Sequence, residues 1–336
     1  MESDFRRVEA KVNKNYNIMI LRVLACLGVF VTHLNQIATF PAVISKAFVF
    51  GMYGVFLFFI MSGYLAYDSY GKYKKVCDYY KNRIFRILPL YYLIILWYVF
   101  FFECLLKNRG VPVPEDIYGM GWGRYFLLFS FCVPGDPFWT NLGMTWTISC
   151  FMLFYLLMPV IHKYVKSFSS VCLVIVVSLV VKTILPDGWL QPLCQLYFFL
   201  LGVAINIAIK ESKESIYVVL QLVILICLVI YAPLNYPMIF GSILSIVFVC
   251  ACRNQSGSLQ KVHWLNRGIE WIDKNSFEIY LFHPIVMYFI QYYVIDTRYE
   301  VNLYKILIYI IGTILIVELK SGVVKIFGTC FGAKYN

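Results

Sequence analysis

The sequence predicts an all-α protein, a polytopic membrane helix bundle of about ten transmembrane helices in a single domain over residues 1–336. Its composition is 61% hydrophobic and 14% charged, whereas soluble domains carry about a quarter charged residues. The apolar residues also gather in runs close to the roughly 20 residues that a helix needs to cross a bilayer. About ten spans with short connections use up the chain, so we expect no second folded domain.

Ten apolar segments follow one another along the chain, at residues 17–38, 48–69, 87–106, 142–164, 170–186, 189–209, 215–232, 236–252, 277–295 and 303–327. No charged leader with a cleavage site precedes Asn17, so we expect the first segment to be retained as a span that acts as its own signal. The 11 cysteines are scattered and lack C-x-x-C spacing. We interpret them as small hydrophobic side chains, not as disulfides or metal ligands.

The distribution of basic residues predicts the orientation of the chain. If the N-terminus is cytoplasmic, most of the 29 lysines and arginines fall in inner loops and tails. The outer connections then hold only Lys46, Lys107, Arg109, Arg124, Lys182, Arg298 and Lys305. This bias follows the positive-inside rule and predicts that both termini are cytoplasmic. The same loops account for the net charge of +11, so we expect a lipid bilayer and no nucleic acid as partner.

Two connections have a distinctive composition. The outer connection 107–141 is rich in Gly, Pro and Trp, which make turns and flat aromatic surfaces, and we expect it to cover an extracellular cavity. Its apolar part, YFLLFSFCV, is too short to cross and is expected to dip into the membrane or lie along it. The connection 253–276 carries Trp264, Leu265, Ile269, Trp271 and Ile272 among charges, which suggests an interfacial amphipathic helix.

The first apolar segment contains two polar residues, Arg22 and His33, that a membrane span rarely carries. They are 11 positions apart, which places them on one helix face about 16 Å apart along the axis. An arginine at the centre of a span costs roughly 2.5–3.5 kcal/mol, so such residues usually face a partner or water. We therefore expect both to line one wall of one cavity. The alternatives are that Arg22 snorkels to the cytoplasmic interface and that His33 bonds a neighbour at the helix end.

A second pair of cations, Arg83 and Arg86, stands just before Pro89 and the third predicted span. The two are three positions apart and lie on the same side of a helix. Guanidinium groups in this arrangement can hold a phosphate bidentately, as lysines cannot. The alternative is that the positive-inside rule alone explains basic residues at this boundary.

The segment SFEIYLFHPIVM places Tyr280 and His283 on one helix face, three positions apart, and Pro284 in mid-span. Proline at this point frees a backbone carbonyl. A neutral imidazole deep in an apolar span needs a hydrogen-bond partner. His283 is therefore either a structural hydrogen-bonding residue or a wall residue of the same cavity.

Four of these patterns, taken in order, resemble the acyltransferase 3 family of polytopic membrane enzymes. Arg22 to His33 resembles its R-x10-H signature, and GVFLFFIMSGYL at 54–65 resembles its second-helix signature. RIFRILPLYY is similar to its arginine-rich start of the third helix, and YLFHPIVM to its late Y-L-x-H-P element. Members of this family transfer acyl groups, commonly acetyl, to sugars and other hydroxyl or amine acceptors. The ten-helix topology agrees with the resemblance.

One position departs from the family pattern. Many members that modify polysaccharides carry an acidic residue where this chain has Phe151, and no carboxylate replaces it nearby in the sequence. Other members, including relatives that act on enterobacterial antigen, resemble this sequence in lacking the acid. The departure concerns the subgroup and the acceptor, not the family.

The resemblance implies acetyl-CoA, or another acyl-CoA, as a donor that enters from the cytoplasm, and no metal. Arg83 and Arg86 would bind the donor's phosphates, and Arg22 would draw its diphosphate into the bundle. The reaction implied is O-acetylation of a cell-surface polysaccharide or a lipid-linked sugar. The protein would then be a multi-pass protein of the bacterial cytoplasmic membrane.

The resemblance also implies roles for the remaining polar residues. His33 would be the base that takes a proton from the acceptor hydroxyl, or a transient acyl carrier. Imidazole suits either task because its ordinary pKa of about 6.5 lets it accept and return a proton near neutrality. Tyr280 or His283 would orient the acyl carbonyl or the acceptor.

A flippase or polysaccharide exporter without acyl-transfer chemistry is the alternative, with the same polar residues lining a substrate path. The sequence shows no two halves with matched broken helices, which disfavours that class. A purely structural bundle would leave Arg22 without a partner.

Overall fold

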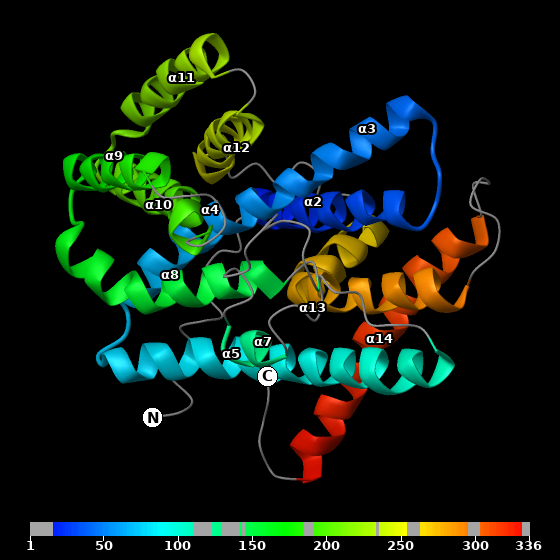
Figure 1. The fold of residues 1–336 in the computed structure, drawn as a ribbon. Coiled ribbons are helices and arrows are strands. Elements are labelled where there is room, and N and C mark those ends of the chain that lie inside the picture. Colours follow the sequence, from blue (N-terminus) through cyan, green and yellow to red (C-terminus); the bar gives the residue numbers. More distant parts are fainter. Residues whose placement is uncertain are drawn as a thin grey trace.

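The computed structural model describes residues 16–110, 122–128, 142, 145–184, 191–232, 235–253, 263–294 and 303–330. All regular secondary structure in these ranges is helical, which confirms the all-α class (Figure 1). The α-helices are α2 (Tyr16–Thr32), α3 (Ala42–Phe50), α4 (Gly54–Tyr70), α5 (Val76–Val99), α7 (Gly123–Phe126), α8 (Thr145–Tyr164), α9 (Phe168–Ile184), α10 (Gln191–Lys210), α11 (Glu214–Tyr231), α12 (Tyr236–Arg253), α13 (His263–Tyr293) and α14 (Leu303–Cys330). Short turns η1 (His33–Gln36), η2 (Gly51–Tyr53) and η4 (Lys107–Arg109) are 3₁₀-helical, and η3 (Phe100–Leu106) is a π-helix.

Seven helices among the described residues are long and apolar enough to cross a membrane. They run over Tyr16–Gln36, Ala42–Tyr70, Val76–Arg109, Thr145–Tyr164, Leu193–Lys210, Glu214–Tyr231 and Tyr236–Arg253. The other three predicted segments coincide with the shorter α9 and with the long helices α13 and α14. The protein is therefore a polytopic helical membrane bundle in which every predicted apolar segment is helical, and the count of ten spans stays a prediction.

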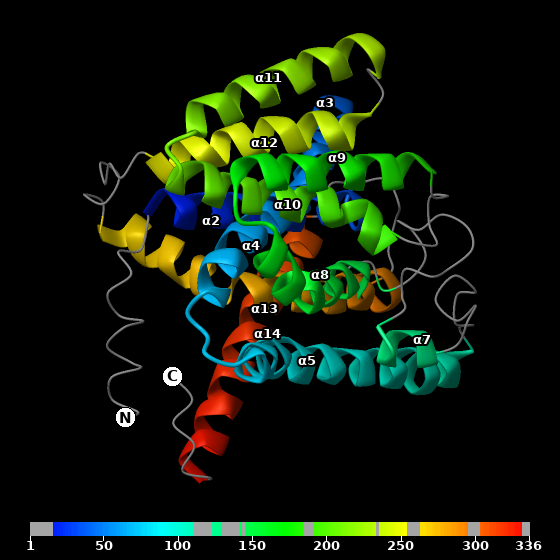
Figure 2. The same cartoon turned by 90° about the vertical axis from the view of Figure 1, so that its left-hand side faces the viewer.

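The helices stack in layers, with α11 and α12 on one flank and α5 on the other (Figure 2). In the middle, α4 crosses α10 so closely that glycine is needed on both sides. A Cβ atom built at Gly63 would overlap the carbonyl oxygen of Phe199, and one at Gly202 would overlap that of Ile60. Small residues that let backbones touch are the usual means of packing helices in membranes.

The helix α13 is longer than the sequence predicted. The segment 263–276 is helical, as expected, but it does not form an interfacial helix of its own, because it continues into the apolar part as one helix of 31 residues. Pro284 lies inside this helix without ending it. The continuity places the charges of the segment and His283 on one rigid element.

The helix α5 also begins earlier than predicted. It starts at Val76, so Arg83 and Arg86 lie inside the helix and not in front of it. Pro89 is accommodated in the same helix. Most of the outer connection 107–141 lies outside the described residues, so its expected role as a cover stays a prediction; its described part includes the short helix α7.

The pairing of α2 with α13 positions the residues singled out in the sequence. Tyr16 donates to Asn266 at 2.6 Å, Arg22 pairs with Asp273 at 2.6 Å, and the Cys26 thiol faces the carbonyl of Ser276 at 3.7 Å. Along these three contacts, the residue numbers of α2 and of α13 rise together, so the two helices run parallel. In this register, Arg22 and Asp273 form one contact between the helices, an ion pair, and His33 and His283 form another, between their rings.

Candidate functional site

A cavity of about 530 Å³ lies among α2, α4, α5, α8 and α13. It is lined by Arg22, Val55, Phe58, Met61, Ser62, Leu65, Ala66, Asp68, Ser69, Lys72, Arg83, Arg86, Ile87, Thr147, Ile148, Phe151, Tyr155, Asp273, Lys274, Ser276, Phe277, Glu278 and Tyr280. Four candidate residues therefore line one space: Arg22, Arg83, Arg86 and Tyr280. They come from three separate helices.

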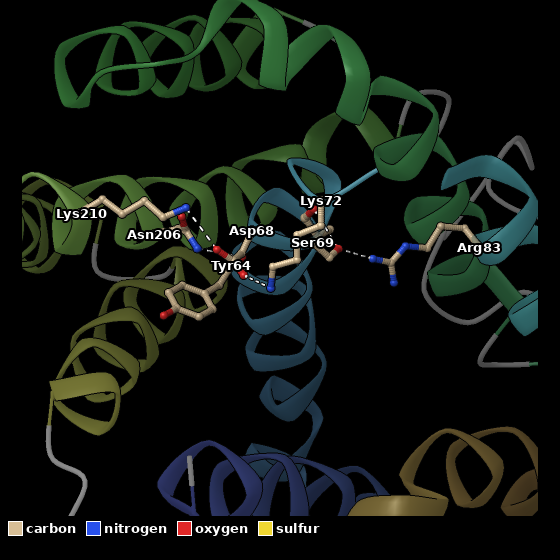
Figure 3. A network of polar contacts seen from close by, with 8 residues as sticks. Tyr64, Asp68, Ser69, Lys72, Arg83, Asn206 and Lys210 are labelled. Atoms are coloured by element: carbon tan, nitrogen blue, oxygen red, sulfur yellow. Dashed lines mark hydrogen bonds and ion pairs between the residues drawn. The ribbon is translucent and has the colours of Figure 1, made fainter. Parts of the chain in front are cut away.

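The cavity is lined by more cationic than anionic side chains. Of its three carboxylates, Asp68 binds Lys72 at 2.8 Å and Lys210 at 3.1 Å. Figure 3 shows Asp68 between these two ammonium groups. Glu278 binds Lys320 at 2.6 Å, a lysine that does not line the cavity.

Three cations of the cavity wall have no carboxylate within ion-pair distance in the part of the chain that the structure describes. They are Arg83, Arg86 and Lys274. Together they give the wall a positive charge that no carboxylate of the described residues neutralises directly. Such a wall attracts an anionic ligand.

Arg83 is held in place by neutral groups. Its Nη2 donates to Ser69 Oγ at 2.6 Å, as Figure 3 shows, and its guanidinium lies over the rings of Tyr79 and Tyr155, 5.3 and 4.9 Å from the ring centroids. Its Nε is buried and lacks a hydrogen-bond partner among the described residues. The aromatic rings orient the planar group while leaving its charge available.

Tyr280 lies at the inner part of the cavity, where its hydroxyl is 2.7 Å from the hydroxyl of Thr147 on α8. His283 follows one helical turn later on α13, with its ring 6.0 Å from that of Tyr280. His33 lies against it, with the imidazole centroids 5.0 Å apart. The two histidines named in the sequence therefore form a pair next to the inner part of the cavity.

The hydrogen bonds of His283 define its tautomer. Its Nδ1 lies 2.9 Å from the carbonyl oxygen of Ile279, which can only accept, so Nδ1 carries the proton. In a neutral imidazole, Nε2 is then an acceptor, and it is buried without a partner among the described residues. Nδ1 of His33 is also buried and without a partner there. The pair thus holds two buried ring nitrogens without a hydrogen-bond partner among the described residues.

One expectation about His33 differs from the structure. Arg22 lines the cavity and His33 does not, so they are not two residues of one cavity wall. The reason is the distance along the helix: His33 lies about 16 Å beyond Arg22, directly after the end of α2 at Thr32.

Phe151, the position at which the sequence departs from the family pattern that it resembles, lines the cavity. It packs edge-on against Phe59 and Phe199, at centroid distances of 5.1 and 5.4 Å. This side of the cavity is therefore aromatic. The buried carboxylate Asp273 reaches the same cavity from α13 instead.

Among the residues of the cavity that the sequence did not single out are Asp273, Thr147, Lys72 and Lys274. A signal for Asp273 was present, because it stands 10 positions before His283, much as Arg22 stands 11 before His33. Lys72 and Lys274 were counted only as topology signals. No local pattern marked Thr147.

Two curated proteins are similar to this chain over most of its length. The chain is 24% identical over 316 residues to YrhL of Bacillus subtilis, a candidate peptidoglycan O-acetyltransferase, with 80% of this chain and 48% of that protein covered. It is 23% identical over 348 residues to the peptidoglycan O-acetyltransferase OatA of Listeria monocytogenes, covering 89% of this chain and 53% of that protein.

The chain thus spans about half the length of the curated relatives it matches. No solved structure matches it. A family model described as an acyltransferase domain matches residues 15–319, nearly the whole chain. On this match, the chain belongs to the acyltransferase 3 family.

Proposed function

We propose that the protein is a membrane acyltransferase that moves an acetyl group from cytoplasmic acetyl-CoA to a hydroxyl of a cell-surface polysaccharide or a lipid-linked sugar. One observation carries this function: a cavity whose wall bears unneutralised cations is lined by Tyr280, and one helical turn further along α13 lies His283, paired with His33. Anion binding and proton transfer are the two tasks that transfer from an acyl-CoA requires.

The donor's phosphates would bind Arg83 and Arg86, with Lys274 adding positive charge beside them. Guanidinium groups hold phosphate bidentately, and Arg83 is already oriented by the two tyrosine rings beneath it. Arg22 would draw the diphosphate toward α2. These assignments extend the cation roles that the family resemblance implies.

The distance between the two contacts of α2 with α13, the ion pair and the imidazole pair, suits a donor whose phosphates and thioester are far apart. Arg22 and His33 are 11 residues apart, about 16 Å at the rise of an α-helix. The pantetheine arm of CoA is a long flexible chain that separates the phosphates from the thioester. Phosphates held near Arg22 would thus place the thioester near the histidines.

In the reaction proposed, a nitrogen of His33 takes the proton of the acceptor hydroxyl as its oxygen attacks the thioester carbonyl. The carbon–sulfur bond then breaks, and the thiolate leaves with the proton that the imidazole returns. His283, with its proton held by Ile279, would accept a hydrogen bond through Nε2 and orient the acceptor or His33. The alternative route passes through an acetyl group carried by His33.

The acceptor class rests on the relatives. Both curated relatives bear names of peptidoglycan O-acetyltransferases, which supports a glycan hydroxyl in the cell envelope. The Trp- and Tyr-containing outer connection suits a sugar, because flat aromatic faces pack against the apolar faces of pyranose rings. The multi-pass protein would act in the bacterial cytoplasmic membrane.

The test is transfer of labelled acetyl from acetyl-CoA to membrane glycans by the purified protein in lipid nanodiscs. His33→Ala and Arg22→Ala are expected to lower the rate at least a hundredfold, within the range for loss of general-base catalysis. The matched control is His162→Ala, because His162 lies on α8 against Tyr67 and Tyr70 and does not line the cavity. That variant should keep a rate within about twofold of wild type.

Unchanged transfer in both His33→Ala and Arg22→Ala would reject the site. Glycan movement across the bilayer without any labelled product would favour the transporter alternative instead. Analysis of the envelope glycans of a deletion strain would then identify the acceptor, through the loss of one O-acetyl group from one sugar.

A further inference from the structure

Asp273 is a buried carboxylate at the cavity that the proposed reaction does not use. Its side chain is 6% exposed, and its Oδ1 lies 2.6 Å from Nη1 of Arg22, whose side chain is 27% exposed. Both residues line the cavity. A negative charge therefore sits beside a cation that we assign to the donor's diphosphate.

The other two carboxylates of the cavity are engaged differently. Asp68 has a side chain 39% exposed and is held by two lysines. Glu278 is bound to Lys320, which lies outside the cavity. Among the described residues, Asp273 is thus the carboxylate that pairs with an arginine of the cavity wall.

This arrangement has two physical consequences. Arg22 has five N–H donors, so a phosphate can contact those that Asp273 leaves open, but it would then lie close to the carboxylate. In a partly buried site, repulsion between these like charges is weakly screened. Conversely, Arg22 without Asp273 would be a partly buried charge without a carboxylate partner, which is costly in the empty cavity.

We propose that Asp273 is an internal competitor of the donor's phosphates, and so a positioning residue that acts through Arg22. Its carboxylate pairs with Arg22 in the empty cavity, separates from it when the anionic donor binds, and pairs with it again when free CoA dissociates. This competition lowers the affinity for acetyl-CoA and raises the rate at which free CoA dissociates. This inference rests on the function proposed above and deepens it.

The test compares CoA binding by the wild type and by Asp273→Asn, as full-length chains in nanodiscs. Loss of the carboxylate is expected to tighten CoA binding about tenfold, a change of about 1.4 kcal/mol. In steady-state transfer, the KM for acetyl-CoA should fall, and kcat should fall as well because release slows. A merely structural role would raise KM. Pantetheine, which lacks phosphates, should bind both proteins equally.

Two further variants separate the mechanism from a general charge effect. Glu278→Gln removes the same charge from the same helix, but its carboxylate pairs with Lys320 and not with Arg22. It should tighten CoA binding by less than about twofold. In an Arg22→Ala background, Asp273→Asn should also have little effect, because the residue through which it acts is gone.

The outcomes distinguish this inference from the function on which it rests. A wild type that binds no CoA would contradict the proposed function itself. A wild type that binds CoA, with Asp273→Asn binding equally or more weakly, would overturn the competitor role alone. Equal gains in Asp273→Asn and Glu278→Gln, or in both Arg22 backgrounds, would overturn it too.

Asp273→Asn leaves Arg22 uncompensated, which lowers recovery of a folded protein wherever the pair contributes to folding. In that case, purification with and without CoA provides the measurement. Recovery that improves with CoA, and not with pantetheine, is expected because the added anion replaces the carboxylate as partner of Arg22. Recovery equally poor in all conditions would contradict the inference.

Discussion

Arg22 turns inward because a carboxylate on another helix neutralises it there. An arginine within the apolar part of a span costs about 2.5–3.5 kcal/mol on insertion scales. The ion pair with Asp273, at 2.6 Å, offsets part of this cost. Arg22 also borders the cavity, so it is accommodated by a partner and a polar space and not by extension to the lipid interface.

Arg83 provides the first prediction at the scale of single residues. Arg83→Lys keeps the charge but loses the planar fork and its contacts with the rings of Tyr79 and Tyr155. The KM for acetyl-CoA should rise about tenfold with little change in kcat, because phosphate binding contributes equally to the ground state and the transition state. Initial rates over a range of acetyl-CoA concentrations measure both constants.

The control for this variant is Arg253→Lys. Arg253 ends α12 and is paired with Glu214 at 3.7 Å, away from the cavity lining, so its KM should match that of the wild type. If kcat of Arg83→Lys fell while KM stayed constant, Arg83 would act on the transition state and not on donor binding.

The hydroxyl pair of Thr147 and Tyr280 gives the second prediction. Thr147→Val removes the partner 2.7 Å from the Tyr280 hydroxyl and should lower the free energy of unfolding by about 1–3 kcal/mol, the cost of a buried polar group left unsatisfied. Thermal unfolding in detergent measures the change. The double variant with Tyr280→Phe should regain stability, because the stranded hydroxyl is gone; additive losses would contradict this explanation.

At the scale of helices, the parallel pairing of α2 with α13 organises the site. It aligns Arg22 with Asp273 and His33 with His283, so that one helix pair carries both an ion pair and the imidazole pair. The two contacts are about 16 Å apart along α2 and about 15 Å apart along α13, at the rise of an α-helix. A shift of α13 by one turn would break both at once.

The crossing of α4 and α10 gives the third prediction. Gly202→Ala places a methyl group against the carbonyl oxygen of Ile60 and should force the helices apart, at a cost of about 3 kcal/mol. The matched control is Gly268→Ala on the exposed side of α13, where a Cβ meets nothing within 4 Å. That variant should be neutral or stabilising by up to about 1 kcal/mol. Equal melting temperatures for the two variants would contradict the packing argument.

At the scale of the whole molecule, cations gather at one end of the bundle. Lys72, Arg83, Arg86 and Lys274 border the cavity, near the start of α5 and in the charged half of α13. The sequence assigns this end to the cytoplasm by the positive-inside rule. A cytoplasmic opening would give acetyl-CoA direct access.

The orientation is the fourth prediction. A C-terminal fusion to green fluorescent protein should fluoresce, and a C-terminal fusion to alkaline phosphatase should be inactive, because the first needs the cytoplasm and the second the outer side. A phosphatase fusion after residue 109 should be active. Activity of the C-terminal phosphatase fusion would contradict the assigned sidedness and the cytoplasmic source of the donor.

Much of the architecture could be predicted because membrane insertion depends on local sequence. Every predicted apolar segment coincides with a helix, and four of the six candidate site residues line one cavity. The helix ends were less predictable: α13 extends through a charged segment, and α2 stops at Thr32. Such limits depend on tertiary contacts that stabilise or interrupt the backbone.

Asp273 and Phe151 have tertiary contacts that local sequence patterns do not predict. Phe151 could be recognised as a departure from the family, but its packing against Phe59 and Phe199 depends on how three helices meet. Asp273 was visible as a charge near a span, yet its partner lies 251 positions away in the chain. No periodicity carries information over that separation.

Hydrophobicity and charge act along the chain itself, so the sequence alone determined the helical membrane class, the positions of the apolar segments and the motifs that carry Arg22, Arg83 and the histidines. Which helices touch is decided by the packing of side chains from distant segments. Only the tertiary structure therefore decided that Arg22 meets Asp273, that His33 meets His283 just beyond the cavity, and that three cations remain without a carboxylate among the described residues.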